Sequence, residues 1–212
     1  MVNLFGDLRK ICKDDDLAHR LEFYAEMDGL KQVFRRTYLI DKSRTENSVE
    51  HSWHMAIAVM VLADYADEPI DRGRAIIMTL IHEFPELLVG DTYAHDKTVD
   101  WEEVAASEAM AVVKMLDALP WVDLSNEMFA IWKEFEDMST PTAKFVNLLD
   151  SLLPSLHNFL TEGKLWQETG VTSTDALRRI DKKVPDGGNS QRLRDVLHAL
   201  IGASVALGYL PE

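Results

Sequence analysis

Apolar residues recur along most of the chain with the spacing of amphipathic helices, and no segment alternates in the way that defines a half-buried strand. Residues 16–35 place Leu17, Leu21, Tyr24, Met27 and Leu30 on one stripe, which predicts a helix. A loop is expected over about 38–47. The pattern therefore favours an all-α protein.

Capping residues divide the remainder of the chain into further helices. Asn47 or Ser48 is expected to cap a helix over SVEHSWHMAIAVMVLADYA, and Glu50 completes a capping box if Asn47 is the cap. The other predicted helices are one opened by Pro69 and Asp71 that runs to about Leu88 and ends at Gly90, one from Asp100 to near Pro120, one over about 125–137, one from Thr140-Pro141 to Gly163, and one over about 190–207. The PDGGN stretch at 185–189 is the clearest break. We expect a bundle with short connections.

Composition narrows the class of protein. The chain has 212 residues, of which 47% are hydrophobic and 27% charged, as in an ordinary globular domain. Its formal net charge of −14 argues against non-specific nucleic-acid binding, since phosphate backbones are repelled. Cys12 is the only cysteine, which excludes an internal disulfide and a multi-cysteine zinc site. No signal peptide or membrane span is expected, so we predict a cytoplasmic protein.

Four ionisable residues interrupt apolar helical segments. His51 lies within VEHSWHMA, His82 and Glu83 follow the apolar run 75–81, and Asp150 interrupts FVNLLDSLLP. A buried charge is costly unless it is paired or bound to a metal. Two imidazoles and two carboxylates are suitable ligands for a borderline divalent ion.

Each of these residues has a plainer explanation when taken alone. His51 is compatible with a satisfied core or surface histidine, and Asp150 with a buried partner for an arginine. His82 and Glu83 are compatible with a helix end that reaches solvent. His54 is expected to be a packing residue or to support a ligand, and His95 a structural or exposed one.

Together the motifs resemble the HD-domain metal-dependent phosphohydrolases, whose pattern is H…HD…D on a helical bundle. The nearest branch contains 5′-nucleotidases that act on deoxyribonucleoside monophosphates. The matching segments are SRTENSVEHSWHMA, IHEFPELLVGDTYAHD and TPTAKFVNLLDSLLP. The resemblance implies a single HD-type helical bundle over 1–212, with a motif-bearing core at about 20–170 and a C-terminal helical extension at 171–212. It also implies a homodimer.

Carried over by position, the resemblance assigns a role to each candidate site residue. It implies one divalent metal ion (Mn, Co, Fe, Ni, Zn or Mg) and a small phosphorylated substrate, expected to be a nucleotide. The assigned residues are His51, His82, Glu83 and Asp150 as metal ligands, Glu86 and Asp91 as the groups that manage protons, Arg36 as the residue that holds the substrate phosphate, and Arg44 as a residue that binds phosphate or braces its loop.

The sequence departs from the pattern of this branch at two positions. Glu83 stands where the family has aspartate, which makes the carboxylate one methylene longer. Thr37 stands where the nucleotidase branch has tryptophan after the phosphate-binding arginine, which suggests a different sugar or base pocket.

Other functions are weighed against this prediction. HEFPE shares the first half of the H-E-x-x-H zinc-protease motif but lacks its second histidine. Only His95 lies in the interval where two-metal cyclic-nucleotide phosphodiesterases carry extra histidines. The alternative hypothesis is a catalytically inactive bundle that binds a nucleotide or a protein partner.

Overall fold

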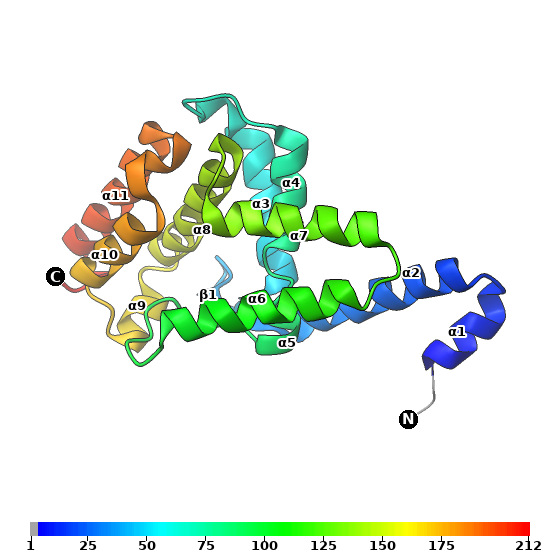
Figure 1. Cartoon of the computed structure of the whole chain (residues 1–212). Coiled ribbons are helices and arrows are strands. Elements are labelled where there is room, and N and C mark those ends of the chain that lie inside the picture. The colour runs from blue at the N-terminus through cyan, green and yellow to red at the C-terminus, as the bar shows by residue number, and fades with distance from the viewer. Residues whose placement is uncertain (1–3) are drawn as a thin grey trace.

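The computed structural model describes residues 4–212 and is helical through most of that range (Figure 1). The α-helices are α1 (Leu4–Cys12), α2 (Asp15–Glu26), α3 (Ser48–Leu62), α4 (Arg72–Ile81), α5 (Glu86–Val89), α6 (Trp101–Asp117), α7 (Val122–Asp137), α8 (Pro141–Leu160), α9 (Lys164–Thr169), α10 (Ser173–Lys183) and α11 (Gln191–Ala206). Short 3-10 helices lie at η1 (Met27–Gln32), η2 (Ala63–Tyr65) and η3 (Pro185–Asn189). Between residues 4 and 212, no helix is both long enough and apolar enough to span a bilayer. The predicted all-α class is confirmed.

Four of the predicted helix starts are confirmed by their capping contacts. The Asn47 side chain accepts a hydrogen bond from the Glu50 amide, and the Glu50 side chain accepts one from the Asn47 amide. The capping box is therefore complete. The side chains of Asp71, Asp100 and Thr140 cap α4, α6 and α8 by accepting hydrogen bonds from first-turn amides. These caps set the first turns of the helices that carry most of the candidate site.

Helix α8 lies at the centre of the bundle, in contact with α3, α4, α7 and α11 (Figure 1). Most of its length is buried, including Phe145, Leu148 and Leu149, which are fully covered. The helix continues through Pro154, even though proline leaves the Asp150 carbonyl without its usual amide donor. Asp150 therefore sits on the most buried helix of the fold, where an unpaired charge is least tolerated.

The expected helix over 16–35 is wrong over residues 27–35. Helix α2 ends at Glu26, η1 follows, and β1 (Phe34–Tyr38) pairs antiparallel with β2 (Thr45–Asn47). The pairing joins Phe34 to Asn47 and Tyr38 to Thr45, with an irregular register between them. Part of the loop expected at 38–47 is thus strand. The two strands are too short to show the alternation that identifies a strand in a sequence.

The apolar stripe expected on residues 16–35 is mostly exposed. Helices α1 and α2 extend away from the bundle (Figure 1), and α2 packs chiefly against α1 and η1. Tyr24 is 78% exposed and Leu17 is 45% exposed, whereas Leu30, beyond the end of α2, is buried. The periodicity indicated the helix correctly, but the face that it marks is not a core face.

The helix expected over 71–88 is interrupted at the candidate site. Helix α4 ends at Ile81, residues 82–85 form a turn, and Glu86 begins the separate helix α5. Gly90 ends α5 with φ of 78°, a left-handed value that glycine adopts without steric cost. In a continuous helix, Glu86 and His82 would lie on the same face, but the turn between α4 and α5 prevents this. The turn instead brings the His82–Glu83 pair and Glu86 to the same end of the bundle.

Candidate metal centre

His51, His82, Glu83 and Asp150 come together as one buried cluster. One ligand atom from each side chain lies within 4.8 Å of the ligand atoms of the others. His51 comes from α3, His82 and Glu83 from the turn after α4, and Asp150 from α8. These are the residues for which the sequence predicts metal ligation, and we call them the four-residue cluster.

His51 has a carboxylate at each ring nitrogen. Its Nε2 lies 2.9 Å from Asp150 Oδ1, and its Nδ1 lies 3.3 Å from Glu46 Oε1. Burial and the charge of Arg35 lower the pKa of His51, but the contacts with Asp150 and Glu46 outweigh them and raise it to about 9. Glu46 is itself 2% exposed, and sequence reasoning missed it. It holds the ring nitrogen of His51 that faces away from the cluster.

The environment of His82 and Glu83 fits a cation between them. His82 Nδ1 lies 2.9 Å from the Thr79 carbonyl, which can only accept a hydrogen bond, so this nitrogen carries a proton. In the neutral ring, Nε2 then presents a lone pair, and it lies 3.0 Å from Glu83 Oε1. His82 Nε2 and Glu83 Oε2 are both buried without a hydrogen-bond partner. Two acceptors facing each other in a buried site are stabilised by a shared cation.

Asp150 also contacts a lysine from the C-terminal part of the chain. Lys183 in α10 pairs with Asp150 Oδ2, while Oδ1 faces His51. Burial raises the pKa of Asp150, but Lys183 and His51 hold it well below its usual range. The residues present thus fit a divalent ion by donor type, by spacing and by the orphaned atoms of His82 and Glu83.

Arg35 is the cation around which the neighbouring carboxylates gather. Its Nη1 lies 2.6 Å from Glu83 Oε1, and its guanidinium also lies 3.5 Å from Glu46, 3.6 Å from Asp91 and 3.8 Å from Glu86. Despite its burial, these charges raise the pKa of Arg35 above its ordinary value, and Arg35 keeps the pKa of the buried Glu83 well below normal. We call Arg35 and these four carboxylates the acidic corner. Sequence reasoning missed Arg35, because the family resemblance assigns the phosphate-binding role to its neighbour, Arg36.

Glu86 and Asp91 lie at the edge of the four-residue cluster. Ser48, at the start of α3, donates a hydrogen bond to Glu86 Oε2. Burial and the nearby charge of Glu83 raise the pKa of Glu86 to about 10, and burial also raises the pKa of Asp91. Both side chains lie within 4 Å of Arg35. The structure places both beside the cluster, where the sequence predicts groups that manage protons.

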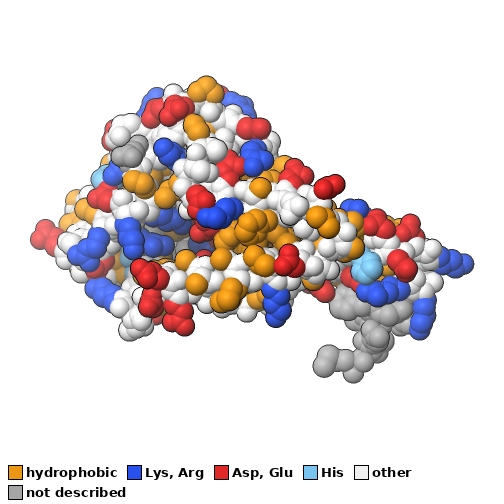
Figure 2. All heavy atoms as spheres, viewed as in Figure 1, with side chains coloured by type: hydrophobic (Ala, Val, Ile, Leu, Met, Phe, Trp, Pro, Cys, Tyr) orange, Lys and Arg blue, Asp and Glu red, His pale blue; other side chains and the backbone are white. Residues whose placement is uncertain are grey.

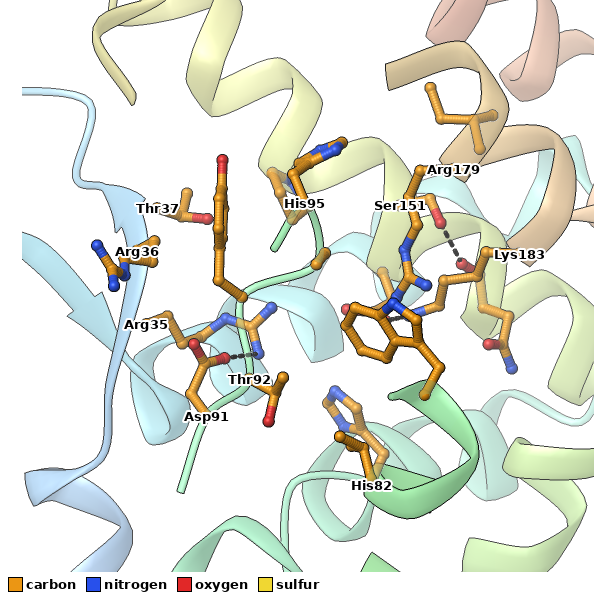
Figure 3. Close-up of a pocket in the computed structure, with 18 of the residues that line it drawn as sticks. Arg35, Arg36, Thr37, His82, Asp91, Thr92, His95, Ser151, Arg179 and Lys183 are labelled. Atoms are coloured by element: carbon orange, nitrogen blue, oxygen red, sulfur yellow. Dashed lines mark hydrogen bonds and ion pairs between the residues drawn. The ribbon is translucent and has the colours of Figure 1, made fainter. Parts of the chain in front are cut away.

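The two predicted phosphate-binding arginines lie in different surroundings. Figure 3 shows Arg35 directed toward Asp91, while the neighbouring Arg36 lies on the other side of β1. Arg36 still lines the cavity, with its guanidinium 5.7 Å from the Tyr93 ring. Arg44 engages both carboxylate oxygens of Glu50, which secures the first turn of α3. Of its two predicted roles, this contact favours bracing of the loop.

Three residues of the four-residue cluster, His82, Glu83 and Asp150, line a cavity of about 490 Å³. Acidic residues line one side and aromatic rings line others, among them Tyr93, Trp101 and Trp166. In Figure 2, Lys and Arg side chains gather around this hollow between α6 and the C-terminal helices. The basic lining residues from α10 are Arg179, Lys182 and Lys183, which we call the basic wall. His95 also lines the cavity, and burial lowers its pKa to about 4.

The family assignment follows from comparison with known proteins. The model of the HD domain family matches residues 27–192, a range that holds the four-residue cluster and the basic wall. The chain belongs to the HD domain family. The cluster lies within this match, on α3, on the turn after α4 and on α8.

Individual relatives extend the comparison. The crystal structure of a predicted metal-dependent phosphohydrolase from Magnetospirillum magnetotacticum MS-1 has a TM-score of 0.82 and 39% identity, over 94% of this chain and 100% of that one. The human 5′-deoxynucleotidase HDDC2 is 31% identical over 131 residues, or 61% of this chain and 62% of the relative. This chain thus spans about three fifths of the length of that relative. A protein from Pyrococcus horikoshii, with 21% identity and a TM-score of 0.58, shares the fold.

Proposed function

We propose that this protein is a metal-dependent phosphomonoesterase that acts on (deoxy)nucleoside 5′-monophosphates or a similar small phosphate ester. The observation that carries the proposal is the four-residue cluster, with its two imidazoles and two carboxylates buried beside a cavity that basic side chains also line. The similarity to 5′-deoxynucleotidases supports the substrate class. A cavity of about 490 Å³ is large enough for a nucleotide.

His51, His82, Glu83 and Asp150 would hold the metal. A divalent ion bound there would polarise the phosphoryl group and lower the pKa of an attacking water molecule. Glu46 would keep the His51 ring in place, and the Thr79 carbonyl does the same for His82. These outer contacts orient the ligands before any substrate arrives.

Glu86 and Asp91 would handle protons at the reacting phosphate. Each lies beside the cluster and within reach of Arg35, which fixes where its carboxylate points. One carboxylate takes the proton of the attacking water, and a protonated acid supplies one to the leaving alkoxide oxygen. Ser48 holds Glu86 from the opposite side, which orients the group further.

Arg36 would bind the substrate at the cavity edge. Its guanidinium lies beside Tyr93, and no ion pair to Arg36 is found among residues 4–212. An arginine in this state can donate parallel hydrogen bonds to phosphoryl oxygens. Arg44, held by Glu50, would keep the start of α3 in position and would not contact the substrate.

A phosphate-release screen tests the proposal. Purified protein is stripped of metal and incubated with nucleoside 5′-monophosphates in the presence of Mn, Co, Fe, Ni, Zn or Mg. We expect metal-dependent release of phosphate from at least one class of monophosphate, together with stoichiometric bound metal by elemental analysis. Bound metal without release from any ester would overturn the esterase proposal. Absence of both would favour an inactive bundle that binds a nucleotide or a protein.

A further inference from the structure

Helix α10 directs two of its basic side chains into the cavity. Arg179 and Lys183 are four residues apart, so they lie on the same face of the helix, and both extend into the cavity in Figure 3. Arg178 lies on a different face, 71% exposed, and pairs with Asp175 on the helix surface. Adjacent arginines in one helix therefore have different surroundings, and only Arg179 faces the candidate site.

Arg179 has no hydrogen-bonding or ion-pairing partner in the described part of the chain. Its Nε is buried and makes no hydrogen bond. Its guanidinium carbon lies 4.7 Å from the centre of the Trp101 ring, a contact that does not satisfy the N–H groups. Burial lowers the pKa of Arg179, although Asp150 and Glu108 counteract this effect from a distance. A half-buried guanidinium with unused donors is costly unless a ligand accepts from them.

Among the described residues, the other half-buried cations that line the cavity are Arg35 and Lys183, and both already have partners. Arg35 is surrounded by four carboxylates, and Lys183 pairs with Asp150. Arg179 stands one helical turn from Lys183, and Lys183 contacts a member of the four-residue cluster. A group held at the cluster therefore comes close to the donors of Arg179. In a protein of net charge −14, an unpaired half-buried cation at this position is selective for an anion.

We propose that Arg179 binds the phosphoryl group of the substrate, on the opposite side of the cavity from the acidic corner. The planar guanidinium can donate two parallel hydrogen bonds to phosphoryl oxygens, which the ammonium of a lysine cannot. Trp101 restricts its rotation, so little conformational entropy is lost when the anion binds. This inference rests on the proposed function for the identity of the ligand, and it adds a binding residue from the C-terminal region, outside the three matching motifs.

The test compares Arg179→Ala and Arg179→Lys with Arg178→Ala, which removes the neighbouring exposed arginine. Binding of inorganic phosphate to the metal-loaded protein is measured by calorimetry, and KM and kcat are measured with the best monophosphate of the release screen. We expect Arg179→Ala to weaken phosphate binding by about 10- to 100-fold, as expected for loss of a charged hydrogen bond. KM should rise by a similar factor, and Arg179→Lys should recover part of the loss.

Controls separate this inference from the proposed function. Metal content and melting temperature should match between Arg179→Ala and Arg178→Ala, so a folding defect would be visible. If Arg179→Ala binds phosphate as tightly as Arg178→Ala, or if the unmodified protein binds no phosphate, the inference is wrong. If the unmodified protein binds phosphate through Arg179 but releases none from any ester, the anion site stands and the esterase proposal fails.

Discussion

The acidic corner and the basic wall face one cavity with opposite excess of charge. In the acidic corner, Glu46, Glu83, Glu86 and Asp91 all lie within ion-pairing distance of a single guanidinium, that of Arg35. On the basic wall, Lys183 has a carboxylate partner and Arg179 has none among residues 4–212. The acidic corner lacks positive charge, whereas the basic wall lacks negative charge.

This difference indicates which ligands would satisfy each side. A divalent cation offsets the excess of carboxylates, because burial, followed by repulsion from Glu83, raises the pKa of Glu86 and Asp91. An anionic phosphoryl group supplies the acceptors that Arg179 lacks. A phosphate ester with a metal ion therefore suits both sides of the cavity at once, and neither ligand alone does so.

Removal of a cluster histidine should have the largest effect. In His51→Ala the protein should lose its bound metal, and phosphate release should fall by about 1,000-fold or more, since loss of a direct ligand exceeds the roughly 10- to 100-fold effect of an outer contact. Elemental analysis and the release assay measure both changes. His54→Ala, one turn along α3 and outside the cluster, is the matched control. Retention of metal by His51→Ala would break the proposed ligand set.

Replacement of Glu86 should separate proton handling from binding. Glu86→Gln keeps the size of the side chain and its contact with Ser48, but it cannot act as an acid or a base. We expect kcat to fall by about 100- to 10,000-fold, with metal content and phosphate affinity nearly unchanged. Steady-state kinetics and phosphate titration test this result. Loss of metal together with kcat would instead show that Glu86 belongs to the ligand set.

The four-residue cluster could be anticipated from the sequence far better than the basic wall. His51, His82, Glu83 and Asp150 interrupt apolar helices, and a charge in that position needs a buried partner, so the pattern identifies the cluster. Capping residues likewise identified the starts of α3, α4, α6 and α8. The roles of the individual site residues remain predictions.

The remaining parts of the site leave little trace in a single sequence. Arg35 and Arg36 are adjacent, and only the strand that follows η1 determines which of them turns toward the carboxylates. Arg179 and Lys183 lie in STDALRRIDKK, which reads as an ordinary solvated helix with basic residues in its last turns. Their function depends on how α10 packs beside α8, and that packing is a tertiary property.

Glu46 offers a finer test of the acidic corner. Glu46→Gln removes the carboxylate at His51 Nδ1 but preserves its shape, so the ring loses part of its orientation and basicity. We expect metal affinity to drop by about 10- to 100-fold, measured by competition with a chelator. Glu50 lies in the same segment but contacts Arg44 and not His51. Glu50→Gln should therefore leave the metal affinity unchanged. Equal affinities in the two variants would mean that Glu46 serves only to pair with Arg35.

Replacement of Glu108 should have the smallest effect, which is a change in how stability depends on pH. Glu108 lines the cavity from α6, and burial, together with the charge of Glu136, raises its pKa to about 7. Because the pKa in the folded state exceeds the unfolded value, the protonated form is favoured by folding. Its contribution to stability is complete below about pH 4.5 and is lost as the pH rises through about 7.

Glu108→Gln should remove the loss of stability that accompanies ionisation of Glu108. The metal-free variant should be more stable than the unmodified protein at pH 8, by on the order of 1 kcal/mol after allowance for solvent screening, and closer to it at pH 5. Denaturant titrations at the two pH values measure the difference. Glu102→Gln, exposed on the same helix, should show no such dependence on pH. If the difference in stability is the same at both pH values, Glu108 is ionised at pH 5 as well as at pH 8, because the cations of the basic wall then stabilise its charged form.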